Sequence, residues 1–255
     1  MTARTDAPAP ATALAARPPR LAGSHVVVYG GSTGIGYALA ELAKAEGASV
    51  TITGRDPAKL EAAARTLGGA RTVRADLIDR AAMARSLEGV ERVDHVFVSA
   101  GSVTIGRVLD GDLGAFERGV DERIWGNLNA LRAAAPKLGP GSSITLMSGV
   151  RADRPAPGSA MTTALVAAVE ALTRALSVEL APLRVNAVSP GWTDTPLVRG
   201  LLGDNFDAVA RSEGARVPLK RFGDAREVAE AVLFLMTNGY VTGEVLHVDG
   251  GLRWA

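Results

Sequence analysis

The sequence predicts an α/β protein in which seven parallel strands form one doubly wound sheet with helices on both faces. Two observations carry this prediction. Short β-branched runs alternate along the chain with Ala- and Leu-rich stretches of helical periodicity, as they do when helical crossovers join parallel strands. Several runs, such as Val26-Val27-Val28 and Val96-Phe97-Val98, are apolar on both faces, which is typical of strands covered on both sides.

The predicted elements alternate strictly along the chain. The helix expected at 158–181 is apolar around most of its circumference, so we expect it to be buried on more than one side, as at a subunit interface. The segment 192–220 interrupts the rhythm and is expected to be a substrate lid at the carboxyl edge of the sheet. The expected strands are residues 25–29, 48–53, 70–74, 94–99, 143–148, 183–188 and 244–248, and the expected helices are residues 34–46, 57–67, 79–88, 112–137, 158–181 and 225–237.

Composition narrows the class of protein. A length of 255 residues suits one domain, and a net charge of +1 gives no reason to expect a nucleic acid or an anionic membrane as partner. The chain has no cysteine and its three histidines are scattered, so we predict no disulfide, no thiolate catalysis and no metal site. No uninterrupted apolar run approaches the roughly 18 residues that span a bilayer.

Residues 1–22 are rich in Ala, Pro, Thr and Arg and contain no apolar h-region, which argues against a signal peptide. A disordered tail is expected there, with a transit peptide as the alternative. The protein is therefore expected to be cytoplasmic, with one folded domain over residues 23–255.

The strongest local signal is the glycine-rich stretch that follows the first predicted strand. Tyr29-Gly30-Gly31-Ser32-Thr33-Gly34-Ile35-Gly36 leads directly into a predicted helix. Glycines at such a turn let the backbone approach a pyrophosphate, and the helix N-terminus offers free N–H groups and a positive dipole end. We therefore predict a dinucleotide phosphate site at Gly30, Ser32, Thr33, Gly34, Ile35 and Gly36.

The end of the second predicted strand indicates which dinucleotide binds. Gly54 stands where a carboxylate would accept hydrogen bonds from the ribose of NAD, and Arg55 follows it. An arginine pairs instead with a 2′-phosphate, and Ser32 can add a donor, so NADP is predicted. Asp56 is the competing feature, although Pro57 after it favours an N-cap for the next helix.

With further matches in order along residues 23–251, the chain resembles the short-chain dehydrogenase/reductase family. That resemblance implies a Rossmann-like, three-layer α/β/α fold, one NAD(P)-binding domain, a small-molecule substrate and a homodimer or homotetramer. The family's glycine motif matches Gly30, Gly34 and Gly36, and its Asn-Asn-Ala-Gly segment is half kept at Ser99-Ala100-Gly101. The further expected cofactor contacts are Asp76, Leu77, Ala100, Gly101, Pro190, Gly191, Thr193 and Thr195.

The catalytic residues that the resemblance implies are missing. The family uses a tyrosine to donate the proton and a lysine four residues later, yet Thr162 and Val166 occupy these positions. Gly149 takes the place of the family's serine, with Ser148 one residue earlier. Arg123 takes that of its asparagine, with Asn127 a less suitable occupant. A threonine hydroxyl is a far weaker acid than a tyrosine with a pKa near 10, and an arginine is a permanent cation.

Three residues remain as candidates near the substrate. Ser148 either hydrogen-bonds a substrate atom, as the one catalytic candidate, or caps its own strand end. Asp153 is either a buried general acid or a solvated loop carboxylate, and Trp192 lines the pocket or packs in the core.

The sequence thus supports two hypotheses. The first is an NADP(H)-dependent reductase that transfers hydride to a carbonyl, imine or activated enone with a non-standard proton source. The second is a catalytically silent NADP-binding protein that serves as a sensor or structural partner.

Overall fold

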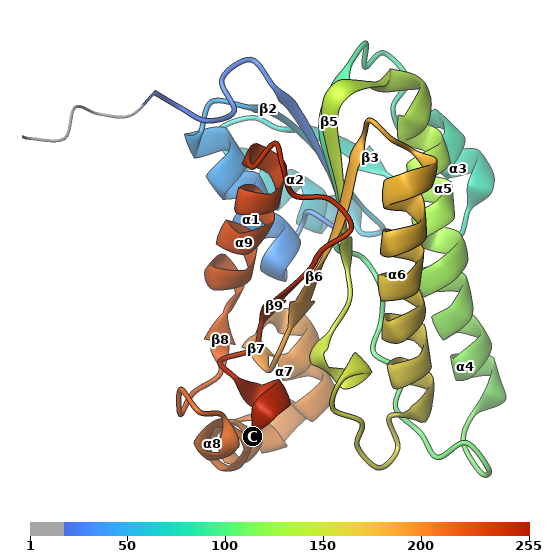
Figure 1. Cartoon of the computed structure of the whole chain (residues 1–255), viewed down its shortest axis with the longest axis vertical. Helices are drawn as coiled ribbons and strands as arrows, with labels where there is room; N and C mark the ends of the chain where they lie inside the picture. Colours follow the sequence, from blue (N-terminus) through green and yellow to red (C-terminus); the bar gives the residue numbers. More distant parts are fainter. Residues whose placement is uncertain (1–17) are drawn as a thin grey trace, which may run out of the picture.

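A computed structural model of the chain describes residues 18–255, which form three layers: a parallel sheet between two layers of helices (Figure 1). The strand order is β3-β2-β1-β4-β5-β6-β9, and every neighbouring pair is parallel. The order reverses between β1 and β4, which creates the switch point where doubly wound sheets bind ligands. The strands are β1 (His25–Tyr29), β2 (Ser49–Gly54), β3 (Arg71–Arg74), β4 (Val93–Val98), β5 (Leu138–Met147), β6 (Arg184–Pro190) and β9 (Val245–Val248).

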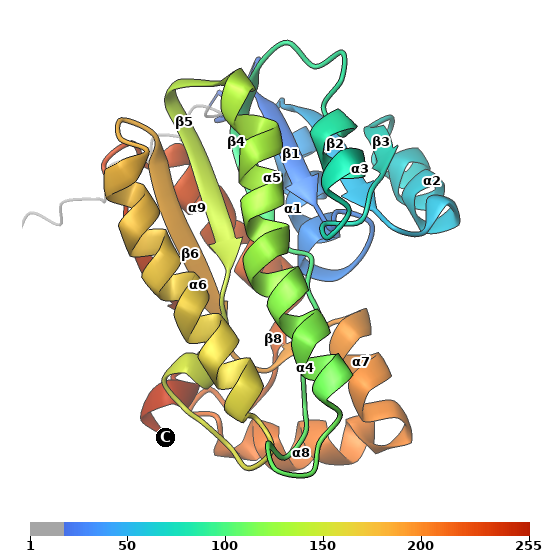
Figure 2. The same cartoon turned by 90° about the vertical axis from the view of Figure 1, so that its right-hand side faces the viewer.

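Helices cover both faces of this sheet. Helices α1, α2 and α9 pack on one face, while α3, α5 and α6 pack on the other, where α5 and α6 run side by side (Figure 2). The helices are α1 (Gly34–Ala45), α2 (Pro57–Thr66), α3 (Arg80–Arg85), α4 (Leu113–Val120), α5 (Gly126–Ala134), α6 (Ala160–Glu179), α7 (Pro196–Leu202), α8 (Phe206–Arg216) and α9 (Ala225–Thr237).

The sheet separates two hydrophobic cores. Along β1, Val26 and Val28 belong to the core under α1 and α9, whereas Val27 and Tyr29 belong to the core under α5 and α6. Successive side chains of a strand point to opposite faces, and all four are fully buried. This explains why the run is apolar without alternation, and it confirms the predicted fold.

The expected helix at 112–137 is interrupted in the structure. Helices α4 and α5 are joined by a π-helical turn, η1 (Asp121–Trp125), which the sequence pattern did not predict. Such turns hold one extra residue and occur often at functional sites. The turn buries the side chain of Arg123, and the side-chain amide of Asn127 donates to the Arg123 carbonyl at 2.6 Å.

The segment 192–220 is a separate substructure at the carboxyl edge of the sheet. It contains α7, α8 and the short strand β7 (Thr193–Asp194), which pairs with β8 (Gly223–Asp224). The ring of Trp192 stacks on that of Phe222 at a centroid distance of 5.2 Å, and Phe206 meets Phe222 edge-on. These aromatic contacts hold the segment together.

Helix α6 is the one helix of the described chain that is long and apolar enough to cross a membrane, with a mean hydropathy of 1.3. Its Val169 and Leu176 belong to the core between the helices and the sheet. The apolar character of the helix therefore has a structural explanation in its packing against the sheet.

The first described residues already contact the domain. Leu21 is buried under α1, and the Arg20 guanidinium makes two hydrogen bonds to the Glu46 carboxylate at 2.8 and 2.6 Å. The packed part of the chain thus begins before the expected domain start at residue 23. The predicted disorder of residues 1–17 lies outside the described residues.

Burial of His95 predicts a pH-dependent stability. Burial of the ring lowers the pKa of His95 to about 4; the Asp94 carboxylate opposes this shift and the Arg184 guanidinium adds to it. The His95 Nδ1 lies 2.8 Å from the Ser143 hydroxyl. Because the unfolded chain binds this proton more tightly, its contribution is complete above pH 6.5 and is lost as the pH falls toward 4. At about 1.4 kcal/mol per pKa unit, the loss approaches about 3 kcal/mol.

This expectation is checked by urea unfolding between pH 4 and 7 in the parent protein and in His95→Gln, which keeps a hydrogen-bonding group. The free energy of unfolding should fall more steeply in the parent. Parallel pH curves for the two proteins would contradict it.

Candidate functional site

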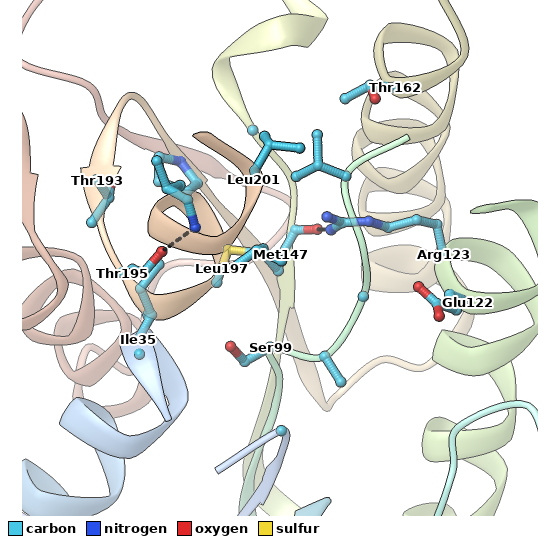
Figure 3. A pocket seen from close by; sticks show the side chains of 18 of the residues that line it. Ile35, Ser99, Glu122, Arg123, Met147, Thr162, Thr193, Thr195, Leu197 and Leu201 are labelled. Atoms are coloured by element: carbon cyan, nitrogen blue, oxygen red, sulfur yellow. Dashed lines mark hydrogen bonds between the residues drawn. The ribbon is translucent and has the colours of Figure 1, made fainter. Parts of the chain in front are cut away.

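A cleft of about 430 Å³ opens at the carboxyl edge of the sheet, on both sides of the switch point between β1 and β4. The loops after β1, β2, β3, β4, β5 and β6 line it, together with η1, α6 and α7. Figure 3 shows lining side chains from several of these segments, among them Ile35, Ser99, Met147 and Thr195. Every cofactor-binding residue predicted from the sequence lines this cleft except Gly36, which lies directly beneath the turn.

The turn between β1 and α1 depends on its glycines. Gly30 and Gly34 have positive φ angles of 88° and 58°, a backbone region that favours glycine. A Cβ on Gly36 would lie 2.1 Å from the Gly30 carbonyl oxygen, so only glycine permits this approach of helix to strand. Thr33 precedes the helix without a side-chain cap, which leaves the first N–H groups of α1 facing the cleft. This cradle fits a pyrophosphate.

The end of β2 carries the groups expected at a 2′-phosphate. The Ser32 hydroxyl lies 3.3 Å from where a Gly54 Cβ would stand, so Ser32 and Gly54 are neighbours. The Arg55 guanidinium is exposed and lies 3.6 Å from the Glu122 carboxylate across the cleft. Asp56 accepts hydrogen bonds from the N–H groups of Ala58 and Lys59, so its predicted role as N-cap of α2 is confirmed.

The loops after β3 and β4 form the next part of the wall. Asp76 accepts one hydrogen bond from the Ile78 N–H at 3.3 Å, and the buried Leu77 follows it. The Ala100 N–H donates to the Tyr29 carbonyl at 3.1 Å, which draws this loop against the glycine turn. A carboxylate and a closely packed backbone here are compatible with an adenine and its ribose.

The residues after β6 reach the glycine turn from the other side. The Thr195 hydroxyl caps α7 by accepting from the Val198 N–H at 3.3 Å, and the Thr195 Cβ lies 3.6 Å from the position of a Gly34 Cβ. Thr193 donates to the Gly191 carbonyl at 3.2 Å. Pro190, Gly191, Thr193 and Thr195 thus share one cleft with the phosphate cradle, as the sequence predicted.

Neither residue at the tyrosine and lysine positions offers an acid to this cleft. Thr162 is 8% exposed, and its hydroxyl donates to the carbonyl of Thr104. Val166 is 2% exposed and lines the cleft as an apolar side chain. The hydroxyl hydrogen of Thr162 is therefore already engaged in a protein hydrogen bond.

Ser148, the predicted catalytic candidate, lines the cleft but directs its hydroxyl toward α6. The hydroxyl lies 2.8 Å from a carboxylate oxygen of Glu170 and 3.3 Å from the Val166 carbonyl, both of which accept. A serine has only one hydroxyl hydrogen to give. Donation to a substrate would require breaking this bond.

Arg123 is the charged group that the fold brings to the centre of the site. Its side chain extends from η1 into the cleft (Figure 3), and it is 8% exposed. The guanidinium donates to the carbonyls of Met147 at 3.1 Å and Ser102 at 3.2 Å. A Cβ on Gly101 would lie 3.0 Å from Nε, so Gly101 provides the space for this side chain.

Burial lowers the pKa of the Arg123 guanidinium, and the neighbouring Glu122 carboxylate opposes this shift. A guanidinium nevertheless stays protonated in proteins. Glu122 itself accepts from the Ser102 N–H at 2.6 Å and faces Arg55. Within residues 18–255, no carboxylate forms an ion pair with Arg123.

The structure places Asp153 outside the cleft. Asp153 is exposed and pairs with His247 at 2.8 Å, so it is the loop carboxylate of the two alternatives rather than a buried acid.

The side-chain ligand atoms of Asp153, Glu170 and His247 all lie within 4.8 Å of one another. Spacing along the chain did not predict this grouping, because three separate segments form it. Arg174 and Arg253 line the same hollow, and their positive charge disfavours a cation there.

Trp192 has both of the roles considered for it. It lines the cleft, and it also packs against Val150, Val217 and Leu252. The Arg151 guanidinium lies over its ring, 5.7 Å from the centroid. The ring thus joins the segment 192–220 to the loop after β5.

Comparison with known proteins agrees with this arrangement. A family model described as "Enoyl-(Acyl carrier protein) reductase" matches residues 30–253. The short-chain dehydrogenase/reductase malC of Malbranchea aurantiaca is 30% identical over 260 residues, which cover 91% of this chain and 95% of the relative. The chain belongs to the short-chain dehydrogenase/reductase family, whose members bind nicotinamide cofactors and act on small molecules.

Solved structures give the same result. The MalC reductase/Diels-Alderase of Malbranchea aurantiaca superposes with a TM-score of 0.87 at 29% identity, covering 93% of this chain and 99% of that protein. A small-chain dehydrogenase in complex with NADPH superposes with a TM-score of 0.80 at 32% identity, covering 91% and 99% of the two chains.

Replacing Gly36 with alanine should disrupt the phosphate cradle. The new methyl group would collide with the Gly30 carbonyl, so α1 must move away from β1. We expect a lower melting temperature and a loss of nicotinamide-dinucleotide affinity, measured by thermal unfolding and by calorimetric titration. Gly239→Ala is the matched control, because a Cβ at Gly239 meets nothing within 4 Å. Equal behaviour of the two variants would show that the close approach is unimportant.

Proposed function

We propose that this protein is an NADP(H)-dependent reductase that transfers hydride to a carbonyl, an imine or an activated enone without a tyrosine as proton donor. The observation that carries the proposal is one cleft that is lined by all of the predicted cofactor contacts except Gly36 and that also contains the buried Arg123 guanidinium, while Thr162 and Val166 stand where an acid and a base are expected. Family membership supports oxidoreductase chemistry. The name of the Malbranchea structure, which includes "Reductase", points in the same direction.

The preference for NADP rests on Ser32, Gly54 and Arg55. No carboxylate stands at the end of β2, and Arg55 can leave Glu122 to pair with a 2′-phosphate. The superposed NADPH complex is consistent with this choice. Pro190, Gly191, Thr193 and Thr195 would border the nicotinamide, and Gly30, Thr33, Gly34 and Ile35 the pyrophosphate.

NADPH, when bound, would supply the hydride. The protein residues then have to position the acceptor and stabilise the charge that develops on it, and correct positioning alone accounts for a large part of many rate enhancements. Protonation in the cleft falls to water or to the substrate, since the hydroxyls of Thr162 and Ser148 are engaged with protein acceptors. A reducible bond that is already activated suits such a site.

A catalytically silent NADP-binding protein is the second candidate. The engagement of both hydroxyls favours it, because the cleft then binds a cofactor without presenting an acid. In either case the exposed small residues on the outer face of α6, such as Ala164, Ala171 and Ala175, are suited to contact with a second copy, as expected for a homodimer or homotetramer.

The cofactor preference is tested with Arg55→Ala. Loss of one charge-assisted pair should weaken NADP binding by about 1.5–3 kcal/mol and leave NAD binding nearly unchanged. Calorimetric titration of both dinucleotides measures this, with Arg65→Ala on α2 as the control away from the cleft. If the parent protein binds NAD and NADP equally, the proposed preference fails.

Turnover is tested by following NADPH oxidation with a panel of imines, enones, quinones and aromatic ketones. The proposal expects at least one class to react well above the rate without protein. In Ser148→Ala, removal of the hydroxyl should lower turnover only if this side chain reorients toward the substrate, so an unchanged rate would end its candidacy as a catalytic residue. NADPH binding without oxidation across the whole panel would favour the silent alternative.

A further inference from the structure

Within residues 18–255, no carboxylate forms an ion pair with Arg123, although the charge of the neighbouring Glu122 partly offsets the cost of its burial. The guanidinium is more than nine-tenths buried and bonds only to two neutral carbonyls, those of Met147 and Ser102. Its remaining N–H groups have no hydrogen-bond acceptor among residues 18–255. Burying a charge without a direct ion pair is costly. A group that faces a ligand cleft in this state is suited to an anionic atom of the ligand.

The walls around Arg123 are mostly apolar. Val103, Val150 and Val166 line the inner part of the cleft. Ile105, Leu197 and Leu201 line its mouth and are 58%, 48% and 40% exposed. Charge interactions are strengthened in such a low-dielectric setting. The cleft therefore combines one fixed cation with an apolar enclosure.

From this combination we infer the substrate class: an apolar molecule whose reducible bond is conjugated to a carbonyl, with the carbonyl oxygen held by Arg123. The inference rests on the proposed reductase function and selects among its three acceptor classes. Arg123 would act as a catalytic residue by electrostatic stabilisation, because it touches the atom on which negative charge develops. Arg123 would stabilise the negative charge on the carbonyl oxygen and would not donate a proton.

The chemistry balances with water as the proton source. NADPH, when bound, would supply the hydride. Addition of that hydride to the β-carbon of an enone would shift the π electrons of the carbon–carbon bond toward the carbonyl and leave an enolate oxygen beside the Arg123 guanidinium. Water would then protonate the α-carbon and leave hydroxide, so that enone, NADPH and water are converted to ketone, NADP⁺ and hydroxide. With a quinone the same addition gives an enolate oxygen, which is stabilised in the same way; water protonates an oxygen, and loss of a proton from the carbon that received the hydride then yields the hydroquinone.

The same charge disfavours a protonated imine. An iminium carries its positive charge at the reacting bond, so a fixed guanidinium beside it raises the energy of the bound state. An apolar enone is neutral before reaction and becomes anionic during it. Arg123 therefore separates the two acceptor classes by the sign of their charge.

Binding is tested first, without turnover. The probe is para-nitrophenol, which resembles an enolate when ionised and turns yellow in that form. In the complex with NADP⁺, we expect the parent protein to lower the apparent pKa of the bound phenol by about one unit or more. Arg123→Met should abolish the shift, and Arg123→Lys should retain part of it. No binding of the probe, or an equal shift in Arg123→Met, would overturn the inference.

Turnover is tested with benzylideneacetone as the apolar enone and dihydroisoquinoline as the imine. Loss of the guanidinium should lower kcat for the enone roughly 100-fold while the Kd of NADPH stays within about twofold. Arg118→Met is the matched control, since Arg118 lies on α4 with an exposed side chain. Faster reduction of the imine than of the enone by the parent protein would contradict the inference.

Two measurements keep these outcomes separable. Thermal unfolding and NADPH titration establish that each variant is folded, and Arg123→Gln serves in place of Arg123→Met should the latter not fold. If the parent protein reduces neither probe, the proposed reductase function loses its support. The para-nitrophenol titration then still decides whether Arg123 is an anion site.

Discussion

The close approach of α1 to β1 is the constraint on which the site depends. A single missing Cβ at Gly36 allows the helix to begin against the Gly30 carbonyl, at a distance that no other residue permits. The first N–H groups of α1 then face the cleft, and the loops after β4 and β6 close around the same point through Ala100 and Thr195. The shape of the glycine turn, which fits a pyrophosphate, depends on that one contact.

The part of the cleft beside α6 and η1 lacks the catalytic residues that the family resemblance implies. Where the resemblance implies a tyrosine and a lysine on α6, the structure has a threonine bound to a carbonyl and a buried valine. The positive charge comes from Arg123 instead, on a different helical segment. The missing side chain of Gly101 leaves space for the Arg123 guanidinium, and the π-helical turn η1 directs the Arg123 side chain into the cleft.

Much of this was predictable because the signals are local. Strand and helix periodicity, the glycine turn and the Asp56-Pro57 cap each depend on residues close together in the chain, and each was found where expected. The interruption of the helix at η1 was not predictable, since Asp121–Trp125 contains no proline or glycine. Nor was the start of β5 at Leu138, because Gly139, Pro140 and Gly141 are poor strand formers; Leu138 pairs with Val93 of β4, and after an irregularity the pairing resumes at Ser143.

The amino-acid sequence by itself determined the parallel sheet, the glycine turn after β1 and the absence of the tyrosine and lysine, because each of these follows from residue type and spacing. Only the tertiary structure decided where the remaining polar groups point. The Ser148 hydroxyl bonds to Glu170, Asp153 pairs with His247 outside the cleft, and Arg123 is buried without an ion-paired carboxylate among residues 18–255. Side-chain direction depends on contacts between distant segments, and those contacts exist only once the sheet and its helices are assembled.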